Sequence, residues 1–159
     1  MTPITEKDWP LFRRLLSEPQ VIRHCFDAPS ESDARARFES RLPTWSVESE
    51  HWLCLVMVDK QSQQPIGVTG CVMENGIAEL GYLLLPEFFG RQYGTESLAA
   101  LLELLKAQCG VKQFKAVVTE GNIASERVLE KCGFRLGQVV PEAYEIGGRL
   151  LADHIYVLS

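Results

Sequence analysis

Hydrophobic residues recur with two different spacings along the chain, and the spacing changes near residue 51. In the first third the intervals are three and four residues, which is typical of an amphipathic helix. These apolar positions are Trp9, Phe12, Leu15 and Leu16. We expect this helix to end before Pro19, because the residue preceding a proline is disfavoured in the α conformation. The polar segment that begins at Ser30 starts a second predicted helix, which runs to about Leu42 and is stopped by Pro43.

Beyond His51, short apolar runs bounded by polar turns indicate strands. Three strands are predicted at 52–58, 65–73 and 77–85. The second and third form an antiparallel hairpin, because Asn75-Gly76 supplies the positive φ angles of a tight two-residue turn.

The rest of the chain alternates between the two patterns. An amphipathic helix is predicted at 95–109, a strand at 114–119 and a helix at 122–132. Strands at about 135–140 and 150–158 follow, separated by the Gly147-Gly148 turn. This order predicts an α+β fold, in which helices pack on a mixed sheet.

Composition narrows the class of protein. A length of 159 residues fits one domain, and a formal net charge of −5 argues against a nucleic-acid partner, which needs a basic surface. No apolar run reaches the roughly 20 residues of a membrane span, and the N-terminus lacks the layout of a signal peptide. Five irregularly spaced cysteines, without a C-x-x-C pair, argue against a metal site and indicate reduced thiols in a cytoplasmic protein.

A glycine-containing segment, Gly90-Arg91-Gln92-Tyr93-Gly94-Thr95, joins a predicted strand to the start of a predicted helix. The first turn of a helix has unpaired amides and a dipole that favours an anion, and Arg91 adds positive charge. The segment matches neither a Walker loop nor a dinucleotide fingerprint. On its own it is better explained as an ordinary connection between a strand and a helix, since such connections commonly contain glycine.

A second segment, Asn122 to Phe134, begins with a favourable helix cap. Ser125 lies three residues after Asn122, which places both polar groups on one side of the first turn. A capped amphipathic helix with a buried face explains the apolar positions, but it does not explain why this helix and the glycine-containing segment occur together in this order.

With both segments in this order, the chain resembles the Gcn5-related N-acetyltransferases (GNAT), in particular the RimJ/RimL-like branch. The resemblance is carried by residues 79–96 and by the pattern N-x-x-S-x-R-V-L-E-K-x-G-F at 122–134. It implies one domain over residues 1–159, with a twisted, mostly antiparallel sheet of six or seven strands. Helices flank this sheet, which is splayed at the acetyl-CoA cleft, with a bulge near Gly81. The first strand of the branch is missing or short here.

The resemblance also implies a cosubstrate, acetyl-CoA, and no metal. Amides of β-strand residues would bond the pantetheine arm, amides of the glycine-containing segment would hold the pyrophosphate, and Asn122 would bond the other side. The implied cofactor-binding residues are Leu83, Leu84, Leu85, Gly90, Arg91, Gln92, Tyr93, Gly94, Thr95 and Asn122. Gln92 stands where the family pattern has its first glycine.

The resemblance implies two catalytic residues. Glu79 would act as the base that deprotonates the amine, and Ser125 would protonate the leaving thiolate in place of a tyrosine one turn later, where this chain has Leu129. Their structural alternatives are a solvent-facing strand residue and a hydroxyl bonded to its own helix backbone. Tyr144 and Glu142 would line the acceptor pocket, where acidic groups favour a cationic amine.

The sequence thus predicts an N-acetyltransferase that transfers an acetyl group to a primary amine by direct attack in a ternary complex. The acceptor is a small molecule or a protein N-terminus, and the enzyme is a monomer or a homodimer. One alternative is a catalytically silent acyl-CoA-binding sensor, and another is a plain α+β interaction domain.

Overall fold

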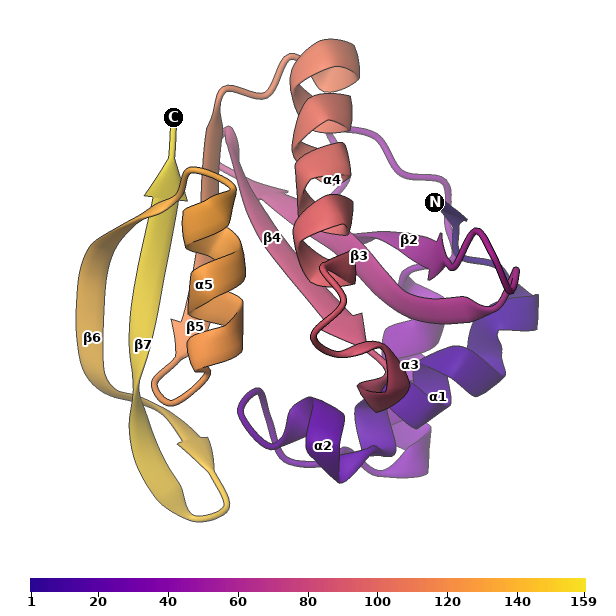
Figure 1. Ribbon diagram of the computed structural model, residues 1–159, viewed down its shortest axis with the longest axis horizontal. Coiled ribbons are helices and arrows are strands. Elements are labelled where there is room, and N and C mark those ends of the chain that lie inside the picture. Colours follow the sequence, from indigo (N-terminus) through magenta and orange to yellow (C-terminus); the bar gives the residue numbers. More distant parts are fainter.

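The computed structural model describes residues 1–159 and is built on a seven-stranded sheet in the order β1-β2-β3-β4-β5-β7-β6 (Figure 1). Neighbouring strands are antiparallel except for β4 and β5, which are parallel. The strands are β1 (Thr2–Pro3), β2 (Leu53–Val58), β3 (Pro65–Glu74), β4 (Ile77–Leu84), β5 (Gln113–Thr119), β6 (Arg135–Ile146) and β7 (Arg149–Leu158). The predicted α+β class with a mostly antiparallel sheet is confirmed.

Helices cover both faces of the sheet (Figure 1). The helices are α1 (Trp9–Ser17), α2 (Pro19–Ile22), α3 (Glu31–Ser40), α4 (Tyr93–Cys109) and α5 (Ile123–Lys131), with short 3-10 turns η1 (Glu6–Asp8) and η2 (Pro86–Phe88). Leucines of α4 and α5 pack with β4 and β5 in one apolar core, whereas α1, α2 and α3 pack in a second core against the other face. Strand β2 separates the two, since Leu53 belongs to the first core and Cys54 to the second.

The central strands β4 and β5 part after a short pairing. They are paired only from Ile77 and Gln113 to Glu79 and Lys115. Beyond this point β4 stays paired with β3, and β5 stays paired with β7 up to Thr119. The predicted splay of the sheet is confirmed.

The bulge predicted near Gly81 is absent, because the β3–β4 register runs unbroken through this residue. Each of the two diverging strands follows its own antiparallel partner, so sheet twist can separate them without an extra residue. Gly81 instead lies under an aromatic side chain: a Cβ there would be 3.5 Å from the Trp52 ring.

Several elements differ in length from the prediction. Strand β1 is reduced to two residues that pair with Val56 and Leu55, in line with the short first strand expected. Strand β6 extends past residue 140 to Ile146, with a register irregularity that spans Pro141. A proline fits there because β6 is the edge strand of the sheet. None of the helices combines the length and the hydropathy needed to cross a membrane.

Candidate active site

A cleft of about 430 Å³ opens where β4 and β5 diverge. Its walls come from the end of β4, the connection to α4, the first turns of α4 and α5, and the segment around α2. A cavity of about 150 Å³ continues from it between the two strands. Tyr82, Asn122 and Ser125 line both spaces, so the two form one continuous site.

The hydrogen bonding of β4 decides which of its amides face the cleft. The Leu85 amide donates to the Ile66 carbonyl at 2.9 Å, so the predicted role of this amide in binding the cofactor is wrong. Bonded pairs alternate in an antiparallel ladder, so the register also turns the Leu83 amide toward β3. The amides of Tyr82 and Leu84 point to the opposite edge, from which β5 has already departed. Of the predicted amides, only that of Leu84 therefore faces the diverging strands.

The connection between β4 and α4 presents the first amides of α4 to the cleft. Gly90 and Gln92 adopt left-handed φ angles of 74° and 67°, and Gln92 is the N-terminal cap of the helix. The Gln92 side chain makes no capping hydrogen bond, and the Glu96 amide is the one that donates to its carbonyl. Amides 93–95 thus begin the helix without side-chain or helix acceptors, in the geometry that suits an anion.

Arg91, predicted to hold the pyrophosphate, does not line the cleft. Its guanidinium lies over the Phe88 ring, 5.7 Å from the ring centroid. Positive charge comes instead from Arg127 and Lys131 on α5 and from Arg23 after α2. No aspartate or glutamate lines the cleft, although the chain as a whole has a net charge of −5. The site therefore suits an anionic ligand.

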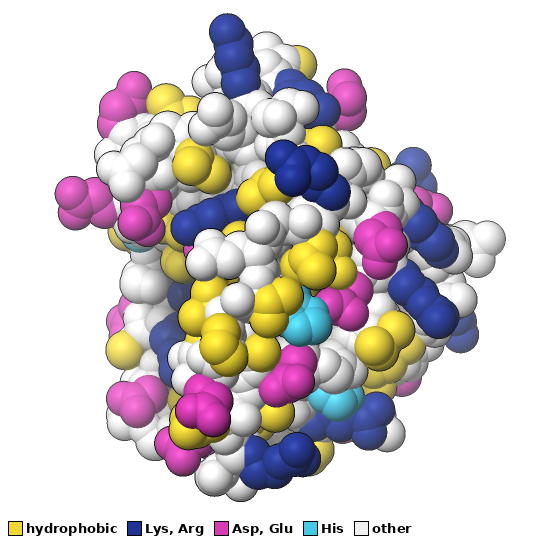
Figure 2. Space-filling model, turned by 90° about the vertical axis from the view of Figure 1, so that its left-hand side faces the viewer, with side chains coloured by type: hydrophobic (Ala, Val, Ile, Leu, Met, Phe, Trp, Pro, Cys, Tyr) yellow, Lys and Arg dark blue, Asp and Glu magenta, His cyan; other side chains and the backbone are white.

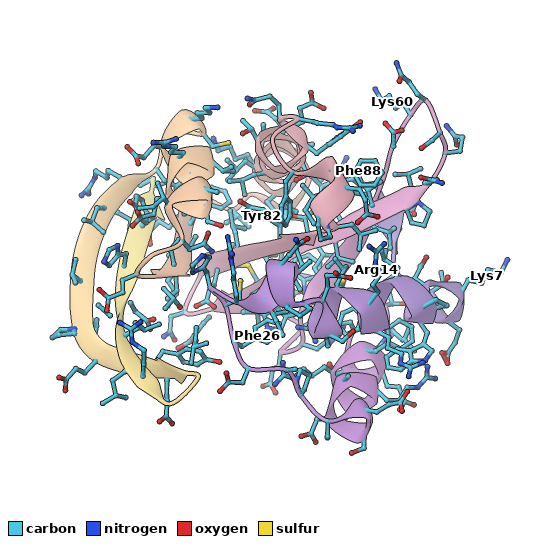
Figure 3. The ribbon with its side chains drawn as sticks, turned by 60° about the horizontal axis from the view of Figure 1, so that its bottom comes forward. Lys7, Arg14, Phe26, Lys60, Tyr82 and Phe88 are labelled. Carbon is cyan, nitrogen blue, oxygen red and sulfur yellow. The ribbon has the colours of Figure 1, made fainter.

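Two polar contacts hold the connection between β4 and α4 in place. Arg14 on α1 donates to both oxygens of Glu87, at 2.9 and 2.6 Å, and this contact lowers the pKa of the Glu87 carboxyl (Figure 3). The Tyr93 hydroxyl donates to Asp59 in the β2–β3 turn at 2.7 Å. The start of α4 is thus tied to both neighbouring layers of the fold.

The start of α5 brings Asn122 and Ser125 to the cleft. The Asn122 side chain accepts a hydrogen bond from the Ser125 amide at 3.4 Å, which confirms it as the helix cap. The Ser125 hydroxyl lies 3.2 Å from the hydroxyl of Tyr82 on β4. Burial raises the pKa of Tyr82, and its bond to Ser125 opposes this only in part, so Tyr82 remains a neutral phenol at physiological pH.

Glu79 lies on the other side of β4. It lines a cavity of about 300 Å³ that faces α1 and α3, and its Oε1 is 3.7 Å from Nζ of Lys115. This cavity, which we call the acceptor-side cavity, shares Cys25, Tyr82 and Leu83 with the cleft. The structure therefore places the two predicted catalytic residues at adjoining spaces that meet along β4.

Tyr144 and Glu142 line neither the cleft nor the acceptor-side cavity. They lie in the distal part of β6, where Tyr144 is 41% exposed and Glu142 has a left-handed φ of 49°. Apolar side chains are visible on the face of the molecule to which β6 and β7 belong (Figure 2). The exposed hydrophobic residues of these strands are Leu136, Val139, Tyr144 and Leu150. The hairpin at which an acceptor pocket is predicted therefore lies apart from the cleft and from the acceptor-side cavity.

Sequence reasoning missed several polar residues that line the cleft. Tyr82 could have been found from strand alternation, since it lies three residues after Glu79 and therefore on the opposite face. Arg127 and Lys131 are spaced four residues apart on a helix whose cap had been assigned, so they share one face. No sequence signal places Arg23 and Cys25, because they approach the cleft from a distant segment.

Comparison with known proteins identifies the family. Residues 1–135 match the acetyltransferase (GNAT) domain, so the chain belongs to the GNAT family, whose members carry out acetyl-CoA-dependent N-acetylation. It is accordingly an N-acetyltransferase. It is similar to the uncharacterized N-acetyltransferase p20 of Bacillus licheniformis, with 24% identity over 146 residues that cover 89% of this chain and 82% of that protein.

Solved structures share the fold at low sequence identity. The spermidine N-acetyltransferase from Vibrio cholerae, in complex with CoA and spermine, superposes with a TM-score of 0.83 at 17% identity, covering 98% of this chain and 92% of that one. RimL, a ribosomal L7/L12 α-N-protein acetyltransferase in complex with coenzyme A, gives a TM-score of 0.83 at 18% identity, with coverages of 99% and 91%. A GNAT acetyltransferase from Bacillus anthracis gives 0.82 at 18% identity, with coverages of 99% and 92%.

Proposed function

We propose that the chain, acting as one domain over residues 1–159, transfers the acetyl group of acetyl-CoA to a primary amine by direct attack in a ternary complex. The observation that supports this most strongly is the meeting of two spaces along one strand. The cleft on one side of β4 has no aspartate or glutamate in its lining and contains the paired hydroxyls of Tyr82 and Ser125. The cavity on the other side contains the Glu79 carboxylate. Such an arrangement lets two substrates meet at the diverging strands.

The residues of the cleft fit acetyl-CoA, an elongated anion that would supply the reactive thioester. Amides of Tyr82 and Leu84 face the diverging strands and would bond the arm. Amides 93–95 and those of the preceding loop would hold the pyrophosphate, with Arg127 and Lys131 supplying positive charge. Asn122 keeps its amide nitrogen for the cofactor, since its oxygen caps α5.

The chemistry follows from the positions of Glu79, Ser125 and Tyr82. An α-amine has a pKa of about 8 and is mostly protonated at pH 7, so Glu79 would take its proton, directly or through water. The amine nitrogen then forms a bond to the acetyl carbon while the carbon–sulfur bond breaks. Ser125 would donate a proton to the leaving thiolate, and the adjoining Tyr82 hydroxyl would return one to Ser125. The nitrogen, now bonded to the acetyl carbon, would give up its second proton through water to restore the Tyr82 hydroxyl, and Glu79 would release the first proton to solvent.

Within the family we place the chain in the RimJ/RimL-like branch, on the residues at 79–96 and 122–134. The acceptor is a small amine or a protein N-terminus, since structural neighbours include a spermidine acetyltransferase and an α-N-protein acetyltransferase. We further propose a monomer or homodimer in the cytoplasm, a location that suits five unpaired cysteines.

The proposal is tested by two measurements on the purified protein. Calorimetric titration should detect binding of acetyl-CoA, and a thiol-release assay with a panel of primary amines should detect turnover. Absence of acetyl-CoA binding would overturn the proposal as a whole. Changing Arg127 and Lys131 of the cleft to glutamine should weaken the binding of acetyl-CoA. Lys112→Gln, which changes an exposed residue outside the cleft, should not.

Glu79→Gln provides a test of the base. We expect the rate to fall most at low pH, where more of the amine is protonated, and the loss to shrink as pH approaches the pKa of the amine. The measurement is the pH profile of kcat/KM for both forms. A variant whose profile has the same shape as that of the wild type would remove Glu79 from the mechanism.

A second candidate function, a silent acyl-CoA-binding module, is supported by Leu129. This residue stands where the resemblance expects a tyrosine, and it is only 3% exposed, in the core. Tight binding of acetyl-CoA without turnover of any amine would favour this candidate.

A further inference from the structure

Two arginines from the end of α3 reach the acceptor-side cavity, and neither has a carboxylate partner. Arg41 is half-buried, with its guanidinium 5.4 Å from the ring centroid of Phe12 and 5.8 Å from that of Trp52. Arg37 is exposed, and its guanidinium lies 5.5 Å from the ring centroid of Phe26, which projects from the segment between α2 and α3 (Figure 3). Both arginines line the cavity, and no ion pair of the chain includes either of them.

Arg35, on the same helix, differs from these two arginines because it has carboxylate partners. It also stacks on aromatic rings, but it donates to the Glu6 carboxylate and lies within 3.6 Å of Glu39. Arg41 makes one hydrogen bond, from its Nη1 to the Arg37 carbonyl at 2.9 Å. A guanidinium has five donors, so capping the helix leaves most of those of Arg41 for another acceptor.

The cavity around these arginines is otherwise apolar. Of its 18 lining residues 12 are hydrophobic, and Glu79 is its single acid. Glu79 lies beside Lys115 at the opposite strand edge rather than beside the arginines. Burial lowers the pKa of Arg41, and nearby Arg37 lowers it further, so an anion placed here would relieve the cost of burying that charge.

The arginines are also close to the reacting centre. Arg41 stacks on Trp52, and the Trp52 ring in turn covers Gly81, next to Tyr82 and beyond the last β4–β5 pair. One aromatic ring therefore separates the cationic end of the cavity from the strand at which the two substrates meet. A short molecule with an anion at one end and an amine near it can span this distance.

We propose that the acceptor is a free amino acid with an apolar or aromatic side chain, whose carboxylate is held by Arg41 and Arg37 and whose amine lies toward Glu79. This inference rests on the proposed function and specifies its substrate class. The apolar walls receive the side chain, and the planar guanidinium of Arg41 binds the carboxylate. A polyamine is disfavoured, because two uncompensated positive charges would repel it.

The test compares L-phenylalanine and L-leucine with phenethylamine, spermidine and a peptide with a free N-terminus. We expect kcat/KM for the amino acids to exceed that for phenethylamine by about 100-fold, since the carboxylate can make charge-assisted hydrogen bonds that phenethylamine cannot make. Arg41→Gln should remove most of this preference by raising KM for the amino acids far more than KM for phenethylamine. Arg35→Gln, on the same helix but outside the cavity, is the matched control and should keep the preference.

A second measurement needs no turnover. Calorimetric binding of N-acetyl-L-phenylalanine, which retains the carboxylate, should weaken by about tenfold in Arg41→Gln and stay unchanged in Arg35→Gln, the scale expected for loss of a charged pair. Preference for spermidine or for the peptide would overturn this inference while leaving the acetyltransferase proposal intact. A weaker affinity of Arg41→Gln for coenzyme A would also overturn it, because the arginine would then belong to the cofactor. Failure of every amine, by contrast, would count against the proposed function itself.

Discussion

At the scale of single residues, the contact between Tyr82 and Ser125 depends on a glycine. A Cβ at Gly94 would lie 3.3 Å from the Tyr82 ring, closer than most such contacts, so a side chain there would push the ring away. Gly94 stands at the start of α4, where its small size lets the helix approach β4. Gly94 therefore leaves room for the contact between the Tyr82 and Ser125 hydroxyls, and its amide is one of those that we propose to hold the pyrophosphate.

Ser125→Ala removes the hydroxyl that we assign to protonation of the thiolate. We expect kcat to fall by about 100-fold, the scale of a lost general acid, and the affinity for acetyl-CoA to be kept. Steady-state kinetics and calorimetry check this. Ser32→Ala, in the first turn of α3, controls for loss of a helix serine and should leave both values unchanged. An unaltered kcat in Ser125→Ala would show that the thiolate leaves without its help.

At the scale of elements, α5 carries residues that we propose for both catalysis and cofactor binding. Its N-terminal turn carries Asn122 and Ser125, and its later turns bring Arg127 and Lys131 to the same cleft. Lys131 also donates to the Gln92 side chain at 3.3 Å, which links α5 to the cap of α4. The two helices thus face each other across the cleft with their polar groups turned inward.

Changing both Arg127 and Lys131 to glutamine tests this role of α5. We expect the Kd for coenzyme A to rise about three- to tenfold, because exposed charge pairs each contribute up to about 1 kcal/mol. The affinity should also become less sensitive to salt, since screening acts on the lost charges. Titrations at low and high ionic strength measure both effects. Equal salt dependence in the two forms would mean that these side chains do not contact the ligand.

The elements also show what the sequence could predict. Periodicity located α4 and α5, and the Asn75-Gly76 turn predicted the β3–β4 hairpin, whose register closes at Glu74 and Ile77. That register also decides which amides of β4 face outward, so the error at Leu85 could have been avoided by counting in steps of two from the turn. The family resemblance indicated that β4 binds the cofactor, but it did not indicate which amides of β4 point toward β3 and which point toward β5.

Other parts of the site were beyond the reach of sequence reasoning. The displacement of Arg91 follows from the left-handed conformations at Gly90 and Gln92, which direct its side chain to the Phe88 ring. Arg41 reaches the acceptor-side cavity only because α3 packs against α1, where the rings of Phe38 and Phe12 meet, a contact that spacing along the chain does not reveal. The distal β6 was missed because Pro141 interrupts its pattern, while the edge position tolerates the proline.

At the scale of the whole molecule, long-range polar contacts tie the active-site loop to both layers of the fold. Arg14 secures Glu87 from the helical side, and the Tyr93–Asp59 bond secures the start of α4 to the β2–β3 turn. The Asp59 carboxyl also accepts bonds from Ser62, the larger cause of its lowered pKa, with Tyr93 next. The stability of the contact between the β2–β3 turn and the start of α4 therefore depends on Asp59 being ionised.

Tyr93→Phe tests this link through pH. The pKa of Asp59 is lowered in the folded state, so its contribution is present above about pH 4 and is lost as pH falls through the folded value. Without the Tyr93 hydroxyl the folded pKa moves back toward the ordinary one, so Tm should drop at about pH 7 and the difference should narrow at about pH 3. Thermal unfolding at both pH values measures it. A deficit of the same size at both would exclude the ionised carboxylate as its cause.

The divergence of β4 and β5 has a consequence for local opening of the central sheet. Four strands lie on one side of the junction and three on the other, joined through three residue pairs at its closed end. A ligand that hydrogen-bonds to the open edges of both β4 and β5 would connect the four-stranded and three-stranded parts of the sheet. Its binding would therefore stabilise both parts together. At a hundredfold excess over Kd, such a ligand adds about 2.7 kcal/mol to the free energy of unfolding. Amide hydrogen exchange along the open edges of β4 and β5 should slow accordingly, so that protection of the central sheet rises and falls with cosubstrate supply.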